Sequence, residues 1–300
     1  MIYETNHPLS KENYLHGLNK CFPGWGDETT FNWFYRNASF PRADMITASR
    51  GGNYVAGSSV VYRTLQVNST PHLVGIMSGS WTLPEARKQG CFTEMIRISK
   101  SLCEDKKAIA LLAYVTEANP SRRRIESEGS CLIPSVYAVS EGIFGTPSVG
   151  VSFQNEFSDQ FVSTLHKTAP DHSISFTYQT EKEFYKQFID RPLPVLGFQL
   201  PCGACGIIEK AGDTDRVLCL KTSHFKQRLN AMNQLRFLSA RNQRNFFFYA
   251  TANDDLRIAK ELGMTLIPGF ITVSPSKTAG KDLLTAIKRT PWNVQSGDRV

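Results

Sequence analysis

A short turn at residues 82–92 carries the residue types most able to bind a ligand. It reads TLPEARKQGCF and places Arg87, Lys88 and Gly90 just before a stretch with helical spacing. The backbone N–H groups at a helix N-terminus point outward, and the helix dipole adds positive potential there. Gly90 would let that backbone approach a ligand closely. The turn therefore predicts a site for an anion such as a pyrophosphate.

The order of residues in this turn excludes two common phosphate-binding motifs. A Walker loop ends in Gly-Lys-Ser or Gly-Lys-Thr, and the usual dinucleotide fingerprint has three glycines. The sequence of the turn fits neither motif. The anion would be held by another kind of strand-turn-helix unit.

The elements that must position this turn follow from the spacing of apolar residues. Alternation predicts a meander of three strands before the turn, and a helical stripe follows it. The expected strands of the first half are 45–49, 54–66, 72–82, 108–115 and 131–139, and the expected helices are 10–21, one from 27 onward, 93–102 and 119–128. The fold class is thus a mixed α/β sheet.

The turn resembles the coenzyme A loop of the GNAT acyltransferase superfamily, which has the pattern Arg/Gln-x-x-Gly-x-Gly/Ala. Arg87, Gln89 and Gly90 fit that pattern, and Asn119 matches the Asn that opens the next helix of the family. Phe92 departs from it, since Gly or Ala is usual there. A Gly-x-Phe version resembles one subgroup of larger, two-part acyltransferases.

The resemblance implies a mechanism in which an amine attacks an acyl-coenzyme A thioester directly. Backbone amides at the end of the strand before the turn would polarise the thioester carbonyl. These amides belong to Gly79, Ser80, Trp81 and Thr82. The pyrophosphate would be held by Arg87, Lys88, Gln89, Gly90, Cys91, Phe92 and Thr93. Asn119 would contact the pantetheine arm, and Arg122 or Arg123 the adenosine phosphate.

The general acid and base are less well indicated. Many members of the family have a tyrosine seven residues after the Asn, but Glu126 stands there. Tyr137 or Tyr114 is then the candidate acid, although an aromatic residue in an apolar strand also suits a core. Glu117 is the candidate base, acting through water, and an exposed turn carboxylate is the alternative.

Two segments of the chain are nearly alike and indicate a duplicated fold. Residues 129–140 read GSCLIPSVYAVS, and residues 263–274, 134 positions later, read GMTLIPGFITVS. The expected domains are 1–155, a GNAT acyltransferase domain, and 156–300, a degenerate copy. The second half should contain helices 181–188, 225–240 and 253–262 and strands 195–200, 206–210, 216–220, 246–251 and 265–273. Residues 157–180 look polar, and Trp292 and Asp298 resemble a closing strand.

The second copy lacks the feature that makes the first turn a binding site. Its counterpart of the turn is Lys221-Thr222-Ser223-His224, which has no glycine. We therefore expect one coenzyme A site, in the first copy. The spacing of Cys202, Cys205, Cys219 and His224 is typical of zinc sites, but a hairpin around Gly203 explains it as well, and no metal is expected.

Composition limits the partners and the compartment. The chain has 300 residues, 34 basic and 27 acidic, which gives a net charge of +7 and favours acidic or phosphorylated ligands. Aromatic residues are not interleaved with the charges, so nucleic acid is possible but not favoured. The isolated cysteines and the absence of an apolar run suggest a cytoplasmic protein without a membrane segment. The oligomeric state is unknown from sequence.

The sequence favours an acyl-CoA-dependent N-acyltransferase. Its co-substrate would be acetyl-CoA or another acyl-CoA, and its acceptor the primary amine of a small molecule. One alternative is a macromolecular acceptor, either a protein or a modified nucleic acid. Another is a catalytically silent protein that binds coenzyme A or a partner, since the usual tyrosine is missing.

Overall fold

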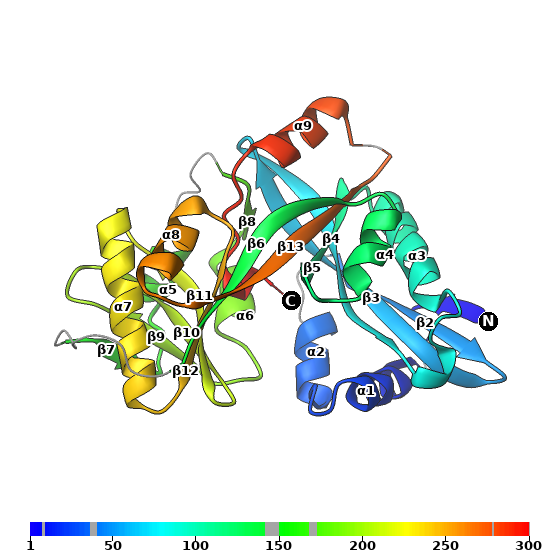
Figure 1. Ribbon diagram of the computed structural model, residues 1–300, viewed down its shortest axis with the longest axis horizontal. Coiled ribbons are helices and arrows are strands. Elements are labelled where there is room, and N and C mark those ends of the chain that lie inside the picture. Colours follow the sequence, from blue (N-terminus) through cyan, green and yellow to red (C-terminus); the bar gives the residue numbers. More distant parts are fainter. Residues whose placement is uncertain (8–9, 37–40, 142–149, 168–172, 278, 300) are drawn as a thin grey trace. The chain divides into compact units, whose positions relative to one another are not determined.

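The computed structural model describes residues 1–7, 10–36, 41–141, 150–167, 173–277 and 279–299 (Figure 1). It divides the chain into two compact units. The first unit contains Met1–Ile133 and Phe270–Arg289, and the second contains Pro134–Gly269 and Thr290–Arg299. Each unit therefore takes chain from both halves of the sequence. The division at residues 155 and 156, which concerns the sequence repeat, stays a prediction.

The first unit is built on a mixed sheet with strand order β1-β2-β3-β4-β5-β13. Its strands are β1 (Ile2–Thr5), β2 (Asp44–Arg50), β3 (Asn53–Val67), β4 (Thr70–Thr82), β5 (Ala110–Thr116) and the end of β13 (Thr265–Pro275). The strands from β1 to β4 pair antiparallel, whereas β4 and β5 are parallel. Gly51 and Gly52, with φ of 58° and 80°, give the tight turn between β2 and β3 a backbone that matches strand twist.

Helices cover both faces of this sheet, because successive residues of a strand point to opposite sides. Val60 packs in a cluster with α3 (Cys91–Asp105), whereas Val61 packs in an aromatic cluster with α1 (Ser10–Cys21) and α2 (Glu28–Arg36). The first unit also holds α4 (Ser121–Ser127) and α9 (Lys281–Arg289). The turn at residues 82–92 thus connects a central strand with a helix that packs on the sheet.

In the second unit the strands follow the order β6-β12-β11-β10-β9-β7. Its strands are β6 (Cys131–Ser140, from Pro134 onward), β7 (Ser152–Gln154), β9 (Val195–Gln199), β10 (Cys205–Ala211), β11 (Thr214–Lys221) and β12 (Asn245–Ala250). Its helices are α5 (Asp159–His166), α6 (Glu181–Phe188), α7 (Phe225–Arg241) and α8 (Asn253–Glu261). As with β4 and β5, β11 and β12 pair parallel.

The order of elements repeats along the chain. β4, α3, β5, α4 and β6 are followed by β11, α7, β12, α8 and β13 in the same sequence (Figure 1). α3 begins at Cys91 and α7 at Phe225, which is again an offset of 134 residues. The last strand of each series contributes residues to both units. β6 begins in the first unit and continues into the second from Pro134, whereas β13 begins in the second unit and ends in the first from Phe270.

One expectation for the second half was wrong, and one stretch held elements that were not predicted. The polar stretch from 157 to 180 contains α5 and β8 (Ser175–Thr177), elements that were not predicted from the sequence. Trp292 and Asp298 do not form a closing strand: Trp292 makes an isolated bridge to Ile174, and Asp298 ends a short 3-10 helix, Ser296–Asp298. A reciprocal capping box between Gln295 and Asp298 favours that tight turn over an extended strand.

None of the described helices is both long enough and apolar enough to cross a membrane.

Candidate functional site

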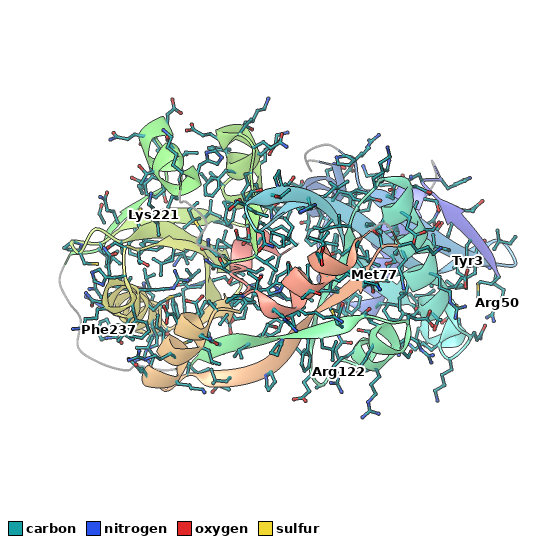
Figure 2. The ribbon with its side chains drawn as sticks, turned by 90° about the horizontal axis from the view of Figure 1, so that it is seen from above. Tyr3, Arg50, Met77, Arg122, Lys221 and Phe237 are labelled. Atoms are coloured by element: carbon teal, nitrogen blue, oxygen red, sulfur yellow. The ribbon has the colours of Figure 1, made fainter. Side chains whose placement is uncertain are left out.

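The turn between β4 and α3 is held by its own side chains. Pro84–Ala86 form one 3-10 turn, and the Arg87 Nε donates to the Thr82 carbonyl at 3.2 Å. The Gln89 amide donates to the Glu85 carbonyl at 2.9 Å, and its oxygen accepts from Arg50 at 2.9 Å (Arg50 is labelled in Figure 2). Gln89, predicted to bind the ligand, thus has both ends of its amide engaged in fixing the loop.

Gly90 leaves the N-terminus of α3 uncapped by any side chain. It takes the N-cap position with φ of 81°, in the left-handed region that other residues rarely adopt. The first N–H groups of a helix have no intrahelical partner. A Cβ at Gly90 would meet nothing within 4 Å, so the space in front of these donors is open. This geometry is compatible with an anion at the helix start, and the predicted anion site stays a prediction.

A depression of about 270 Å³ opens beside this helix start. All of its lining residues belong to the first unit. They are Thr82, Ala86, Arg87, Lys88, Gly90, Cys91, Phe92, Thr93, Pro120, Ser121 and Arg124. The structure therefore brings together seven of the predicted residues with the start of α4.

Arg124 is the charged residue of this depression that was not predicted from the sequence. The sequence offered Arg122 and Arg123 for the adenosine phosphate, but it is Arg124 that lines the depression. Neighbouring residues of a helix point about 100° apart, so three successive arginines cannot share one direction. Arg122 instead places its guanidinium 5.4 Å from the centre of the Phe270 ring (Arg122 is labelled in Figure 2).

The side chains of several predicted residues have partners within the protein. The Cys91 side chain is buried and contacts the Ala86 carbonyl at 3.6 Å, and Phe92 packs against the core around α3. The Asn119 side-chain oxygen accepts from the Ser121 N–H at 2.9 Å and from the Ser121 hydroxyl at 2.7 Å. Asn119 thus caps the start of α4, and its predicted contact with pantetheine stays a prediction.

β4 carries a bulge just before the turn. Gly57 pairs with Trp81 and Ser59 with Ser78, so β4 has one residue more than β3 across this interval. Gly79 stands in the bulge with φ of 55°, and the Tyr14 hydroxyl donates to its carbonyl at 2.8 Å. A bulge removes backbone groups from the ladder, so the amides predicted to meet a thioester are not all used in pairing.

Side chains behind the bulge fix its shape. A Cβ at Gly79 would stand 2.0 Å from the Tyr35 hydroxyl, so no larger residue fits there. The Trp81 side chain is 3% exposed and packs 5.9 Å from the Tyr14 ring. β4 pairs with β5 only through Gly75 with Leu111 and Ile76 with Leu112, within the described residues. No further pairing between β4 and β5 is found among the described residues.

Comparisons with known proteins agree with this architecture. No protein-family model matches the sequence, and no curated protein matches it. Solved structures do match. A putative acetyltransferase from Pyrococcus horikoshii superposes with a TM-score of 0.62 at 10% identity, covering 100% of this chain and 95% of that one. The chain has the GNAT fold.

Two further structures show the range of proteins that share the GNAT fold with this chain. A GCN5-related N-acetyltransferase from Kribbella flavida gives a TM-score of 0.58 at 10% identity, over 91% of this chain and 71% of that one. The N-myristoyltransferase of Saccharomyces cerevisiae with bound myristoyl-CoA gives 0.62 at 10% identity, over 91% and 83%. The expected fold class is confirmed.

The two catalytic candidates fall in different units of the GNAT fold. Glu117 is exposed directly after β5, in the first unit. Tyr137 lies in the second unit, where the Arg299 guanidinium stacks on its ring at 4.5 Å and donates to its hydroxyl at 3.3 Å. Burial raises the Tyr137 pKa, and the Arg299 charge opposes that rise. Both catalytic roles stay predictions.

The turn before α7, the expected counterpart of the turn before α3, has its donors occupied by its own side chains. The His224 Nδ1 accepts from the Gln227 N–H at 3.2 Å and so caps α7. The Gln227 side-chain oxygen accepts from the Ser223 N–H and hydroxyl, and its amide donates to the Cys202 carbonyl. Whereas Gly90 leaves the first turn open, these contacts fill the second.

The zinc-like spacing does not gather ligands in the described part of the chain. Cys202 is exposed, Cys205 and Cys219 are buried, and none forms a disulfide. No group of three or more His, Cys, Asp or Glu side chains is arranged to hold a metal among the described residues. His224 already serves as a helix cap.

Proposed function

We propose that this protein is an acyl-CoA-dependent N-acyltransferase with its acyl-CoA site in the first unit. The observation that carries the proposal is an uncapped helix N-terminus at Gly90, directly after a bulged strand, in a GNAT fold. The same arrangement offers donors for a pyrophosphate and for a thioester carbonyl at the two ends of one short segment.

The coenzyme would be bound mainly by backbone and charge. Gly90 to Thr93 line the depression, and their backbone N–H groups would bind the pyrophosphate, because the helix dipole favours a negative group at this end. Arg87, Lys88 and Arg124 line the same depression, and no acidic side chain does so among its described lining residues. The excess of positive charge in this lining suits a dianionic pyrophosphate and a further phosphate.

The chemistry would take place at the bulge of β4. Backbone N–H groups near Gly79 and Ser80 would stabilise the oxyanion that forms when an amine attacks the thioester. The C–N bond forms, the C–S bond breaks, and the thiolate takes a proton. Glu117 would accept the proton of the amine through water, and Tyr137 is the candidate donor to the thiolate. The hydrogen bond from Tyr14 to Gly79 would keep the peptide plane in place.

Acetyl is the proposed acyl group, and a primary amine of a small molecule the proposed acceptor. A longer acyl chain is the alternative, because one structure of the same fold holds myristoyl-CoA. A macromolecular acceptor is the alternative on the acceptor side. The net charge of +7 favours an acidic or phosphorylated acceptor in either case.

The test combines binding with turnover on the full chain. Titration calorimetry with acetyl-CoA and with myristoyl-CoA measures affinity, and release of free thiol in the presence of an amine panel measures transfer. We expect one binding site per chain and amine-dependent thiol release. Binding without release for any amine, protein or nucleic acid acceptor would show a silent binding protein. If neither acetyl-CoA nor myristoyl-CoA binds, the proposal is refuted.

A further inference from the structure

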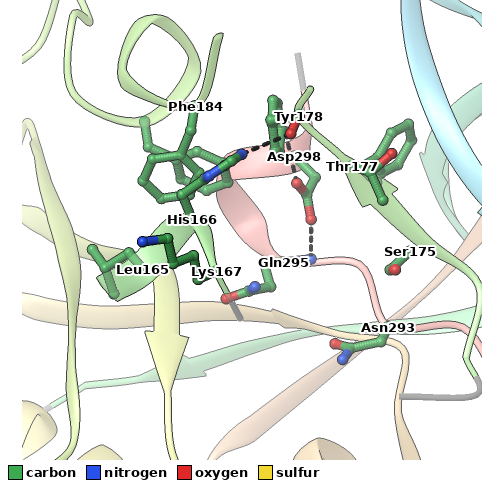
Figure 3. A pocket seen from close by; sticks show the side chains of 12 residues that line it. Leu165, His166, Lys167, Ser175, Thr177, Tyr178, Phe184, Asn293, Gln295 and Asp298 are labelled. Atoms are coloured by element: carbon green, nitrogen blue, oxygen red, sulfur yellow. Dashed lines mark hydrogen bonds between the residues drawn. The ribbon is translucent and has the colours of Figure 1, made fainter. Parts of the chain in front are cut away.

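The second unit contains a pocket of about 350 Å³ whose lining is partly aromatic and partly polar (Figure 3). In the aromatic part, Phe184 and Phe188 stack with their ring centres 4.6 Å apart. In the polar part, the Asp298 carboxylate accepts from the Tyr178 hydroxyl and from the Gln295 N–H, each at 2.8 Å. These hydrogen bonds join groups of the second unit to one another, so we assign them to the stability of the fold rather than to a ligand.

The first unit, by contrast, fills the space beside the bulge of β4 with one large side chain. Ser78, Gly79 and Ser80 at the bulge are partly exposed, whereas the next residue, Trp81, is buried. The Trp81 indole belongs to the aromatic cluster that packs against α1 and α2. An accessible stretch of backbone and a buried indole are thus adjacent in the chain.

Two glycines make the room that this indole occupies. Gly17 lies in the interior of α1 and Gly57 in β3, and both are buried. A Cβ at Gly17 would stand 2.5 Å from Cζ2 and Cη2 of the indole, and a Cβ at Gly57 would stand 2.5 Å from its Nε1. Glycine destabilises the interior of a helix or a strand. The fold therefore keeps two unfavourable residues where the ring of Trp81 needs the space.

The indole contributes bulk to this place rather than a hydrogen bond. Its Nε1 is buried and has no hydrogen-bond partner among the described residues. A buried donor without a partner is destabilising, and an apolar side chain would avoid that penalty. The Tyr14 ring stands edge-on to the indole with 5.9 Å between ring centres, and the Tyr14 hydroxyl donates to the Gly79 carbonyl. One tyrosine thus contacts both the indole and the bulge.

We propose that Trp81 restricts the acyl group of the co-substrate to a short chain, because its indole fills the space beside the bulge that a longer chain would occupy. This inference rests on the proposed function, in which backbone N–H groups near Gly79 and Ser80 bind the thioester carbonyl. The acyl chain extends from that carbonyl carbon, so its first methylenes lie beside the bulge. Removal of the indole would leave an apolar slot between Gly17 and Gly57. An apolar cavity of about 150 Å³ stays dry and can hold a guest the size of benzene.

The test measures the binding of free coenzyme A and of acetyl-, butyryl- and hexanoyl-CoA to the full chain by titration calorimetry, with no acceptor present. Each methylene that becomes buried contributes about fourfold to affinity. We expect the unchanged protein to bind hexanoyl-CoA no more tightly than acetyl-CoA. In Trp81→Ala, hexanoyl-CoA should bind at least tenfold more tightly than acetyl-CoA. In Trp81→Phe, which opens a smaller space, butyryl-CoA should gain several-fold over acetyl-CoA.

Two controls separate chain length from damage to the fold. Trp33→Ala, the same change at another buried tryptophan of the first unit, should leave the preference among acyl chains unchanged. Trp81→Phe keeps a buried aromatic ring, so the test does not depend on the alanine variant alone, and thermal unfolding checks that each variant is folded.

Two results would overturn this inference and leave the proposed function standing, provided that free coenzyme A binds. One is a chain-length preference that is the same in both Trp81 variants as in the unchanged protein. The other is an unchanged protein that binds hexanoyl-CoA at least tenfold more tightly than acetyl-CoA. If neither free coenzyme A nor any acyl-CoA binds to the unchanged protein, the proposed function and this inference fall together.

Discussion

Replacing Gly90 with alanine should separate backbone strain from loss of the proposed coenzyme site. Gly129 offers a matched control within the same unit. The φ angles are 81° at Gly90 and 90° at Gly129, and a Cβ at either position would meet nothing within 4 Å. Each alanine would therefore carry the same left-handed strain without a clash. Only Gly90 lines the depression beside α3.

The expected sizes follow from two different terms. An L-residue in the left-handed region costs about 1–2 kcal/mol. For a domain of 150–250 residues, about 2–4 °C of melting temperature is lost per kcal/mol. Both variants should thus melt a few degrees lower. A hydrogen bond to a charged group is worth about 1.5–3 kcal/mol. If the new Cβ displaces one phosphate contact, Gly90→Ala should bind acetyl-CoA about tenfold to hundredfold more weakly.

Titration calorimetry with acetyl-CoA and thermal unfolding of both variants and the unchanged protein provide the readout. We expect Gly129→Ala to keep its affinity and Gly90→Ala to lose it, with similar melting temperatures. Equal affinities in the two variants, whether both retained or both lost, would refute the assignment of the phosphate site to this turn.

Three further predictions concern the bulge, the charges and the buried thiol. Tyr14→Phe, which removes the hydrogen bond to Gly79, should lower kcat several-fold and stability by about 1 kcal/mol with unchanged acyl-CoA affinity; an unchanged kcat would contradict this. Arg124→Ala should weaken coenzyme binding and flatten its salt dependence, whereas Arg123→Ala, at an exposed position outside the depression, should not. Burial raises the Cys103 pKa from 9.0 to about 12, so the folded protein keeps a proton that the unfolded chain has lost between these values. The free energy of unfolding, measured by denaturant titration, should therefore fall as pH rises from 9 towards 12. For one retained proton the fall is up to about 1.4 kcal/mol per pH unit. A free energy of unfolding that rises over this range would contradict the assignment of the raised pKa to burial of Cys103.

Local sequence pattern was enough to predict most of the elements, and the anion site was proposed from the same kind of pattern. Helix and strand periodicities are set by which side chains face a core, so stretches such as Ser10–Cys21 and Phe225–Arg241 can be read directly from apolar spacing. The strand-turn-helix at 82–92 could be predicted for the same reason, because Gly90 and its neighbours are consecutive in sequence. The offset of 134 residues likewise revealed the repeated order of elements.

What the sequence left out depends on contacts between distant residues. The bulge at Gly79 follows from the register of β4 against β3 and from the packing of Tyr14 and Tyr35, more than 40 positions away. The direction of Arg124 is set by how α4 packs, not by its place in a run of arginines. The pocket around Asp298 joins residue 298 to residues near 175, whose elements are too short to show a periodicity.

The sequence by itself thus determined the mixed α/β fold and the turn that opens α3, because both are written in consecutive residues. Only the tertiary structure decided which side chains surround that turn, how β6 and β13 are shared between the units, and that the second unit holds a polar-aromatic pocket of its own. The physical reason is that backbone conformation depends mainly on neighbours in sequence, whereas the directions in which the side chains of a site point are fixed by tertiary packing.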